Sequence, residues 1–169
     1  MAVGDINSDA PGSGARFNDG KLAMDLIPVS FWVRAWDYDL NHRAGGVNRD
    51  VKIVLHGLER FQEGNDGAPA KILEAFGEGG LRSATRVLEF GAKKYAAWNW
   101  AKGMNWSVPT GCILRHSRAI LVDDEDYDPE SDLPHFGHIL CNVVMLDYFT
   151  KHYPEGDDRP PHHSLIVED

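Results

Sequence analysis

The sequence has few cysteines and no long apolar segment. Only Cys112 and Cys141 occur, and both lie in apolar patterns with helical spacing. Buried free thiols are therefore expected rather than a disulfide, which fits a reducing compartment. No run of about 18 apolar residues exists, and the N-terminus lacks the basic and apolar regions of a secretory signal. These absences predict a cytoplasmic protein without a membrane partner.

Positive charge is also scarce. The chain has 17 Lys and Arg residues against 26 Asp and Glu residues, which gives a formal net charge of −9. Affinity for duplex nucleic acid depends mainly on Lys and Arg side chains that neutralise phosphates. The charge balance therefore argues against a duplex partner, although local basic clusters could hold a small anionic ligand.

Familiar phosphate-binding motifs are absent as well. The stretch from Gly14 to Lys21 resembles a phosphate loop, but five residues separate Gly14 from Gly20 where that motif has four. Leu22 follows Lys21, where Ser or Thr would bind Mg²⁺. No His-Asp dipeptide supports a phosphohydrolase of that type. A Walker A site is therefore excluded.

Helical spacing dominates the part of the chain that can be interpreted. Apolar residues recur at helical intervals over 81–95, and shorter patterns cover 51–62 and 70–76. Ser107 and Pro109 indicate the start of a further helix, which ends near Asp124. No alternating strand pattern occurs, so we expect a mainly α fold of about four to six helices.

The ends of the chain differ in composition from its middle. Residues 1–15 are rich in Gly, Ser, Asp and Pro, which predicts a flexible N-terminal arm. The last strong helical pattern follows Pro134 and is apolar on nearly all sides, so it should lie centrally. Residues 154–169 form a polar C-terminal tail. A single domain over 16–153 is therefore expected.

The clearest functional pattern lies on that last helix. His135, His138 and Asn142 occur at i, i+3 and i+7, so one helix face would present all three. Two imidazoles one turn apart can share a metal ion, whereas the alternative is a hydrogen-bonded pair of core histidines. The acidic run at 123–132 immediately upstream supplies oxygen ligands suited to Mg²⁺ or Mn²⁺. Together these features favour a mixed oxygen and nitrogen metal site.

The 81–95 helix carries a polar stripe. Its members are Arg82, Arg86, Glu89 and Lys93. The stripe could simply be a solvated face with a Glu89–Lys93 pair. In the functional interpretation, Glu89 binds a metal or orients a water, and Lys93 or Lys94 contacts phosphate.

Aromatic residues gather in the loop after this helix. Trp98, Trp100 and Trp106, with Asn99 and Asn105 between them, could stack on a base and recognise its edge. A packed aromatic cluster is an equal alternative. On the next helix, Arg115 and His116 could face a triphosphate or merely solvate the surface, and we favour Arg115 for the ligand.

Four blocks of the sequence, in order along the chain, match one known family. They are RFNDGKLAMDLIP, VLEFGAKKY followed by NWAKGMNWS, LRH, and DPESDLPHFGHILCNVV. In these blocks the chain resembles phage dATP/dGTP diphosphohydrolases of the MazZ type, which are similar to MazG-like all-α nucleotide pyrophosphatases. The stretch at 37–80 has no counterpart, so it is interpreted as an insertion.

The resemblance implies a fold and an activity. The fold is a MazG-like all-α helical bundle with an irregular insertion. The activity is hydrolysis of dGTP, and of dATP, to the monophosphate and pyrophosphate with Mg²⁺ or Mn²⁺. In such phages dGMP feeds the synthesis of 2-aminoadenine nucleotides, and dATP is depleted in the host cytoplasm. A homo-oligomer, dimer or tetramer, is expected.

Site roles follow from the pattern and the resemblance together. Metal ligands are assigned to Glu89, Asp128, His135 and His138, and catalytic roles to Glu89, Lys93 and His138. Substrate contacts are assigned to Asn18, Asp19, Lys21, Lys94, Trp98, Asn99, Arg115 and Asn142. MazG-like enzymes have an acidic pair where this chain has His135 and His138. Two alternatives remain: release of triphosphate or single phosphates, and a non-catalytic nucleotide or metal sensor.

Overall fold

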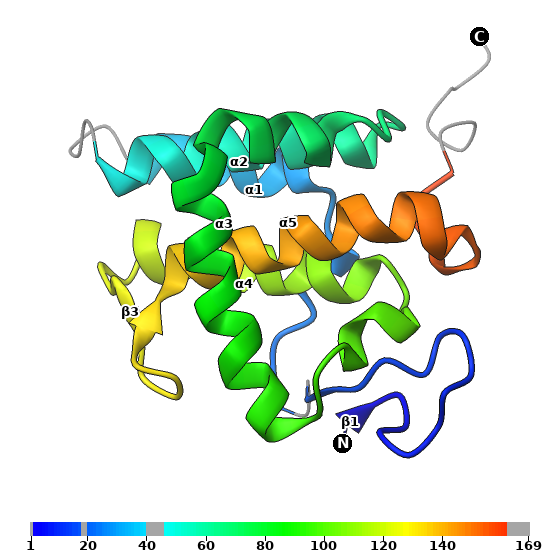
Figure 1. Cartoon of the computed structure of the whole chain (residues 1–169). Helices are drawn as coiled ribbons and strands as arrows, with labels where there is room; N and C mark the ends of the chain where they lie inside the picture. The colour runs from blue at the N-terminus through cyan, green and yellow to red at the C-terminus, as the bar shows by residue number, and fades with distance from the viewer. Residues whose placement is uncertain (1, 18–19, 40–45, 162–169) are drawn as a thin grey trace, which may run out of the picture.

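A computed structural model describes residues 2–17, 20–39 and 46–161 (Figure 1). Within these ranges the chain forms five α-helices, which confirms the mainly α fold. They are α1 (Val29–Asp39), α2 (Val47–Gln62), α3 (Ala68–Lys94), α4 (Ser107–Leu121) and α5 (His135–His152). Three short 3₁₀ helices accompany them: η1 (Met24–Leu26) before α1, η2 (Asn99–Lys102) between α3 and α4, and η3 (Pro154–Gly156) after α5. None of the described helices is long and apolar enough to cross a membrane.

Helix α5 is the centre of the structure. It packs mainly against α3 and α4, and Figure 1 shows it running across the middle of the molecule. Ile139, Leu140 and Phe149 on α5 are fully buried, as expected for a helix that is apolar on nearly all sides. Pro134 is the N-cap residue of α5. The N–H at this position makes no hydrogen bond within the helix, so proline, which lacks an N–H, is tolerated there. The predicted central position of this helix is confirmed.

Helix α3 joins two of the predicted helical segments through a kink. At Gly77 the backbone has φ 59° and ψ −149°, outside helical geometry and in a region that only glycine adopts readily. The chain changes direction there (Figure 1). The second half of α3 then lies against α5, where Gly137 permits a close approach. A Cβ atom at Gly137 would lie 3.1 Å from the carbonyl oxygen of Ser83.

The acidic run before α5 forms a small hairpin rather than an open loop. Strands β3 (Tyr127–Asp128) and β4 (Leu133–Pro134) pair antiparallel, with Asp128 opposite Leu133. The amide of His135 donates to the carbonyl of Asp126 at 2.9 Å. The hairpin therefore fixes Asp128 beside the first turn of α5. Two-residue strands are too short for an alternating pattern, so the sequence did not predict them.

The N-terminal segment lies against η2. A second two-stranded sheet pairs β1 (Ala2–Val3) with β2 (Arg16–Phe17). The amides of Gly12 and Gly14 donate to the carbonyls of Lys102 and Gly103, at 2.7 and 2.8 Å. The flexibility predicted for residues 1–15 and the boundaries of the domain, insertion and tail stay predictions.

Helix α2 and the C-terminal end contribute to the same core. Val51, Val54 and Leu58 of α2 are buried in the cluster that contains the α5 side chains. Arg159 lies over Phe61 of α2, with 4.6 Å between the guanidinium carbon and the ring centroid. Burial would lower the pKa of Arg159, but hydrogen bonds and charge interactions with Asp157 and Asp66 outweigh it and raise that pKa.

Both cysteines are buried free thiols, as the sequence predicted. Cys112 lies on α4 and Cys141 on α5.

Candidate active site

A polar cavity of about 110 Å³ is bordered by α3, α4, α5 and the β3–β4 hairpin. It brings together five residues that the sequence analysis assigned to the site: Lys21, Lys94, Asp128, His138 and Asn142. His116 on α4 and Glu130 in the hairpin turn also line it. Segments far apart in the sequence therefore meet at one small site.

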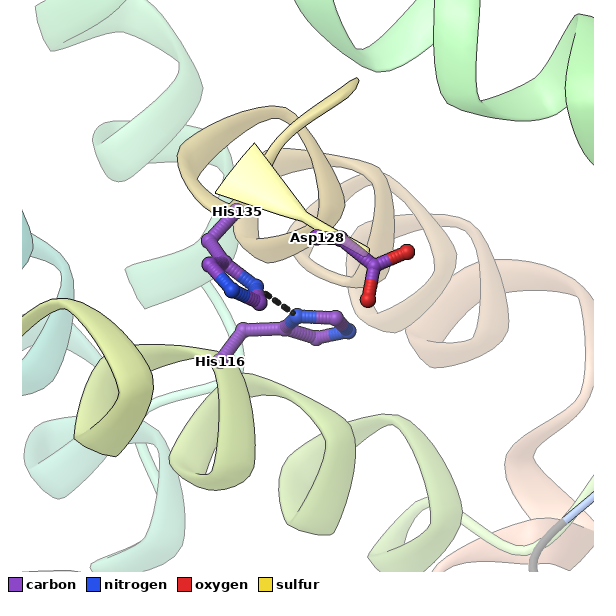
Figure 2. Close-up of side chains that lie close together, drawn as sticks. All are labelled: His116, Asp128 and His135. Atoms are coloured by element: carbon purple, nitrogen blue, oxygen red, sulfur yellow. Dashed lines mark hydrogen bonds between the residues drawn. The ribbon is translucent and has the colours of Figure 1, made fainter. Parts of the chain in front are cut away.

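Three side chains beside this cavity form a potential metal-binding cluster. His116, Asp128 and His135 each offer one ligand atom, and these atoms all lie within 4.8 Å of one another. Figure 2 shows the three side chains converging from α4, β3 and the first turn of α5. His135 is buried, at 4% exposure, whereas His116 and Asp128 are half-buried. The cluster thus joins three elements below the surface.

A chain of hydrogen bonds orients the two imidazoles of this cluster. Nε2 of His135 lies 2.7 Å from Oε1 of Glu125, and its Nδ1 lies 2.8 Å from Nδ1 of His116 (Figure 2). Because a carboxylate only accepts hydrogen bonds, Nε2 of His135 carries a proton. Nδ1 of a neutral His135 then accepts from Nδ1 of His116. A neutral His116 accordingly has its lone pair on Nε2.

Ser131 connects Asp128 with His138. Its hydroxyl lies 2.7 Å from Oδ2 of Asp128 and 2.8 Å from Nε2 of His138. The carboxylate must accept, so the hydroxyl donates to Asp128 and accepts from His138. A neutral His138 therefore carries its proton on Nε2 and its lone pair on Nδ1. The amide of Ser131 also donates to Asp128, at 3.0 Å, which fixes the carboxylate further.

Ring stacking holds the third imidazole against the cluster. The rings of His116 and His138 stack with centroids 4.5 Å apart and planes 14° apart. Asn142, one turn after His138, donates from its side-chain amide to the carbonyl of His138 at 2.8 Å. His135, His138 and Asn142 therefore lie on one helix, as predicted, and the ring that stacks on His138 comes from α4.

Two lysines supply positive charge at the cavity. Nζ of Lys94, near the end of α3, lies 2.6 Å from Oε1 of Glu130. Lys21 reaches the same cavity from the segment before η1. Both side chains belong to exposed residues, so either could contact a ligand that enters from solvent.

Other predicted site residues lie elsewhere. Glu89 lines a separate apolar hollow on α3, and Lys93 is exposed and lines neither the hollow nor the polar cavity. Arg115 donates to the carbonyl of Leu22 and to the sulfur of Cys112, both at 3.2 Å. Asn18 and Asp19 lie outside the described residues. Glu89, Lys93 and Arg115 are therefore not among the residues that line the polar cavity.

The apolar hollow has a volume of about 480 Å³ and lies between the second half of α3, η2 and α5. Trp98 at its edge is 71% exposed and has a φ of 63°, which is unusual for a bulky residue. Asn99 beside it is 3% exposed and donates to the carbonyl of Ala15 at 3.3 Å. Its Oδ1 has no hydrogen-bond partner among the described residues.

The three tryptophans of this region differ in their surroundings. Trp106 is buried and stacks on Phe61, with centroids 5.7 Å apart. Trp100 packs edge-on against Tyr148, with ring centroids 5.1 Å apart. Only Trp98 of the three is highly exposed. The packed-cluster alternative therefore describes Trp100 and Trp106, whereas Trp98 remains accessible to a ligand.

Comparison with protein families identifies the chain. The family model described as dATP/dGTP diphosphohydrolase, N-terminal, matches residues 63–159, which is more than half of the chain. The chain belongs to this dATP/dGTP diphosphohydrolase family. It is therefore a nucleoside triphosphate diphosphohydrolase, as the sequence resemblance implied. No curated protein and no solved structure matches the chain.

The region matched by the diphosphohydrolase family contains most of the site. It includes α4, the hairpin and α5, and so the whole histidine and carboxylate cluster. It begins at Glu63, inside the stretch interpreted as an insertion, and leaves Lys21 outside.

The residues present in this diphosphohydrolase fit a divalent metal ion. Two imidazole nitrogens and a carboxylate oxygen are a common mixed donor set for such ions. The contact between Glu125 and His135 also resembles the carboxylate–histidine pairs that orient metal ligands in other proteins. The geometry and the chemistry of the donors agree on this point.

Sequence analysis missed three members of this site. His116 was considered as a triphosphate contact or a solvated surface residue but not as a metal ligand, because a single histidine on a helix does not reveal which helix it faces. Glu125 was one of several acidic residues in a run, and Ser131 has no pattern of its own. The sequence does not show that the hairpin folds Glu125 and Ser131 back onto α5.

Proposed function

We propose that this diphosphohydrolase hydrolyses dGTP, and also dATP, to the nucleoside monophosphate and pyrophosphate in a metal-dependent reaction at the polar cavity. The observation that carries the proposal is the cluster of His116, Asp128 and His135 beside a cavity bordered by two lysines. A polyphosphate needs both features, a cation site and further positive groups close to it.

The metal ion assigned here is Mg²⁺ or Mn²⁺. A bound ion would neutralise phosphate charge and lower the pKa of a coordinated water. Mg²⁺ prefers an all-oxygen octahedral shell, whereas imidazole nitrogens are better ligands for transition metals. With two imidazoles in the cluster, Mn²⁺ is the favoured ion of the two. His116, Asp128 and His135 are the proposed ligands.

The lysines contact the phosphates in this proposal. Nζ of Lys94 lies 2.6 Å from Oε1 of Glu130. An incoming phosphate oxygen therefore either displaces Glu130 from this ammonium group or binds the ammonium group together with it. Lys21 lines the same cavity from the segment before η1. Ammonium groups stabilise the negative charge that develops on the departing pyrophosphate in the transition state, and this lowers the activation barrier.

His138 is the proposed proton acceptor. A water attacks the α-phosphorus, the bond from that phosphorus to the bridging oxygen breaks, and pyrophosphate leaves. His138 accepts the proton of the water at Nδ1, because Nε2 donates to Ser131. The catalytic roles of Glu89 and Lys93 stay predictions, since neither residue lines the polar cavity.

The base is assigned to the side of the site that carries Trp98 and Asn99. An exposed indole can stack on a purine, and a buried amide can recognise its edge. In a phage, the dGMP formed would feed synthesis of 2-aminoadenine nucleotides while dATP is depleted. A homo-oligomeric state is also proposed, and duplex nucleic acid is not an expected partner.

A product assay tests the proposal. The purified protein is incubated with each common dNTP and rNTP in the presence of Mg²⁺, Mn²⁺ or EDTA, and products are separated by ion-exchange chromatography. We expect metal-dependent conversion of dGTP and dATP to the monophosphate and pyrophosphate. Release of triphosphate or single phosphates would instead indicate a different phosphohydrolase reaction. Saturable nucleotide binding without turnover would indicate a sensor.

A further inference from the structure

The polar cavity and the apolar hollow share one face of α3. Val87, Gly91 and Tyr95 line both of them. These residues are spaced four apart, so they follow one another along a single helix face. The two cavities therefore lie on either side of the same short stretch of helix.

Gly91 lies in the middle of this shared face without a structural reason for being glycine. Its φ is not among the positive values found at other glycines, and it lies within the helical span of α3. An added Cβ would meet no atom of the described residues within 4 Å, apart from its chain neighbours and the helix backbone. Glycine lowers helix stability relative to alanine, so neither conformation nor packing explains it.

The two cavities match the two ends of a purine nucleotide. The hollow is lined mostly by apolar side chains and has Trp98 at its edge, in a backbone conformation that is strained for tryptophan. Asn99, which also lines the hollow, has a buried Oδ1 that no described residue contacts with a hydrogen bond, and such an acceptor suits an N–H of a purine. The polar cavity carries the lysines and the metal-binding cluster.

We propose that the substrate crosses α3 at Gly91, with its purine in the apolar hollow and its phosphates in the polar cavity. The sugar and α-phosphate then pass over the Gly91 backbone, where a side chain would obstruct them. This inference rests on the proposed function for the identity of the substrate. It adds the path of the substrate and a residue that determines binding.

The substitution Gly91→Ala tests the path, and Gly79→Ala is its matched control. Gly79 lies on the same helix, also has open space around an added Cβ, and lines neither cavity. Each alanine should leave the melting temperature unchanged or raise it by up to about 2–4 °C, because alanine is the better helix former. Any loss of binding in Gly91→Ala is then not a loss of folding.

Binding is measured calorimetrically with Mn²⁺ and a dGTP analogue that carries a methylene group between the α- and β-phosphates. We expect Gly91→Ala to weaken binding by about tenfold or more, and Gly79→Ala to bind like the wild type. Inorganic pyrophosphate occupies only the polar cavity, so both variants should bind it equally well.

The possible outcomes separate the two proposals. Equal binding of the dGTP analogue by the wild type and Gly91→Ala would reject the crossing and leave the proposed reaction intact. Weaker binding of both pyrophosphate and the analogue would also reject it, because the change would then act on the polar cavity itself. If the wild type neither binds the analogue nor turns over dGTP, the proposed function fails first.

Discussion

At the residue scale, the site depends on side chains that hold neighbouring neutral imidazoles in defined tautomers. Glu125 determines that Nε2 of His135 carries the proton, and Ser131 does the same for Nε2 of His138. Each histidine is thereby given one nitrogen that donates and one that can accept a proton or bind a metal. Substitutions at these positions should therefore change metal binding or rate without unfolding the protein.

His116→Ala removes a proposed metal ligand. We expect Mn²⁺ affinity to fall by about 100-fold or more, because even residues that only orient ligands contribute 10–100-fold. The measurement is titration calorimetry with Mn²⁺ alone, with circular dichroism to confirm folding. His56→Ala is the control, since His56 is exposed on α2 and is not a member of the cluster. Unchanged Mn²⁺ affinity in His116→Ala would remove this residue from the ligand set.

Ser131→Ala should reduce kcat by about 10–100-fold while the protein stays folded. The hydroxyl donates to Asp128 and accepts from His138, so its loss frees both side chains to reorient. Ser131→Thr retains a hydroxyl and should recover most of the rate. A merely structural role predicts equal kcat in all three proteins. The pH profile of kcat should also shift in Ser131→Ala, because the tautomer of His138 is no longer fixed.

At the element scale, helix faces decide which residues reach the site. Lys94 shares a face of α3 with Val87 and Gly91, and that face borders the polar cavity. Glu89 and Lys93 are also one turn apart, but on another face. The charge pattern of α3 predicted a polar stripe correctly, yet it did not show which stripe faces α5.

The kink in α3 at Gly77 sets the direction of the helix half that lines both cavities. Gly77→Ala should lower stability by about 1–3 kcal/mol, because φ 59° and ψ −149° are strained for any residue with a Cβ. Thermal unfolding should show a melting temperature about 2–4 °C lower per kcal/mol. Gly79→Ala provides the comparison. If both variants were equally stable, the kink would not require glycine.

Periodicity predicted the helices well, because an apolar face must repeat every three to four residues to be buried. The last helix, its central position and the stripe of His135, His138 and Asn142 were all predicted from the sequence. The kink at Gly77 and the β3–β4 hairpin were not. A single glycine and two-residue strands carry no periodic signal, and the meeting of His116 with α5 is a tertiary contact.

At the scale of the whole molecule, net charge and local charge act in opposite directions. The chain carries −9 overall, which repels a polyphosphate. Charges further apart than about 8 Å are largely screened at physiological salt, so the groups bordering the cavity decide binding. Lys21 and Lys94 therefore affect polyphosphate binding more than the net charge of the chain does. A divalent ion at the cluster would add further positive charge.

A metal ion bound at the cluster should stabilise the whole fold, because its ligands come from α4, the hairpin and α5. Binding to the folded state alone adds about 2.7 kcal/mol when the free ion exceeds its Kd by 100-fold. For a chain of this length, that corresponds to a rise in melting temperature of about 5–11 °C. Differential scanning fluorimetry with Mn²⁺, then with excess EDTA, measures the rise and its reversal.

The pattern across variants decides whether that rise comes from the proposed cluster. His116→Ala and Asp128→Ala should lose it, whereas His56→Ala should keep it, because only the first two remove ligands. Mg²⁺ should give a smaller rise than Mn²⁺ at equal concentration, since imidazole is a poor ligand for Mg²⁺. An equal rise in all variants would place the ion elsewhere on this acidic protein. No rise in the wild type at saturating Mn²⁺ would remove the metal from the site.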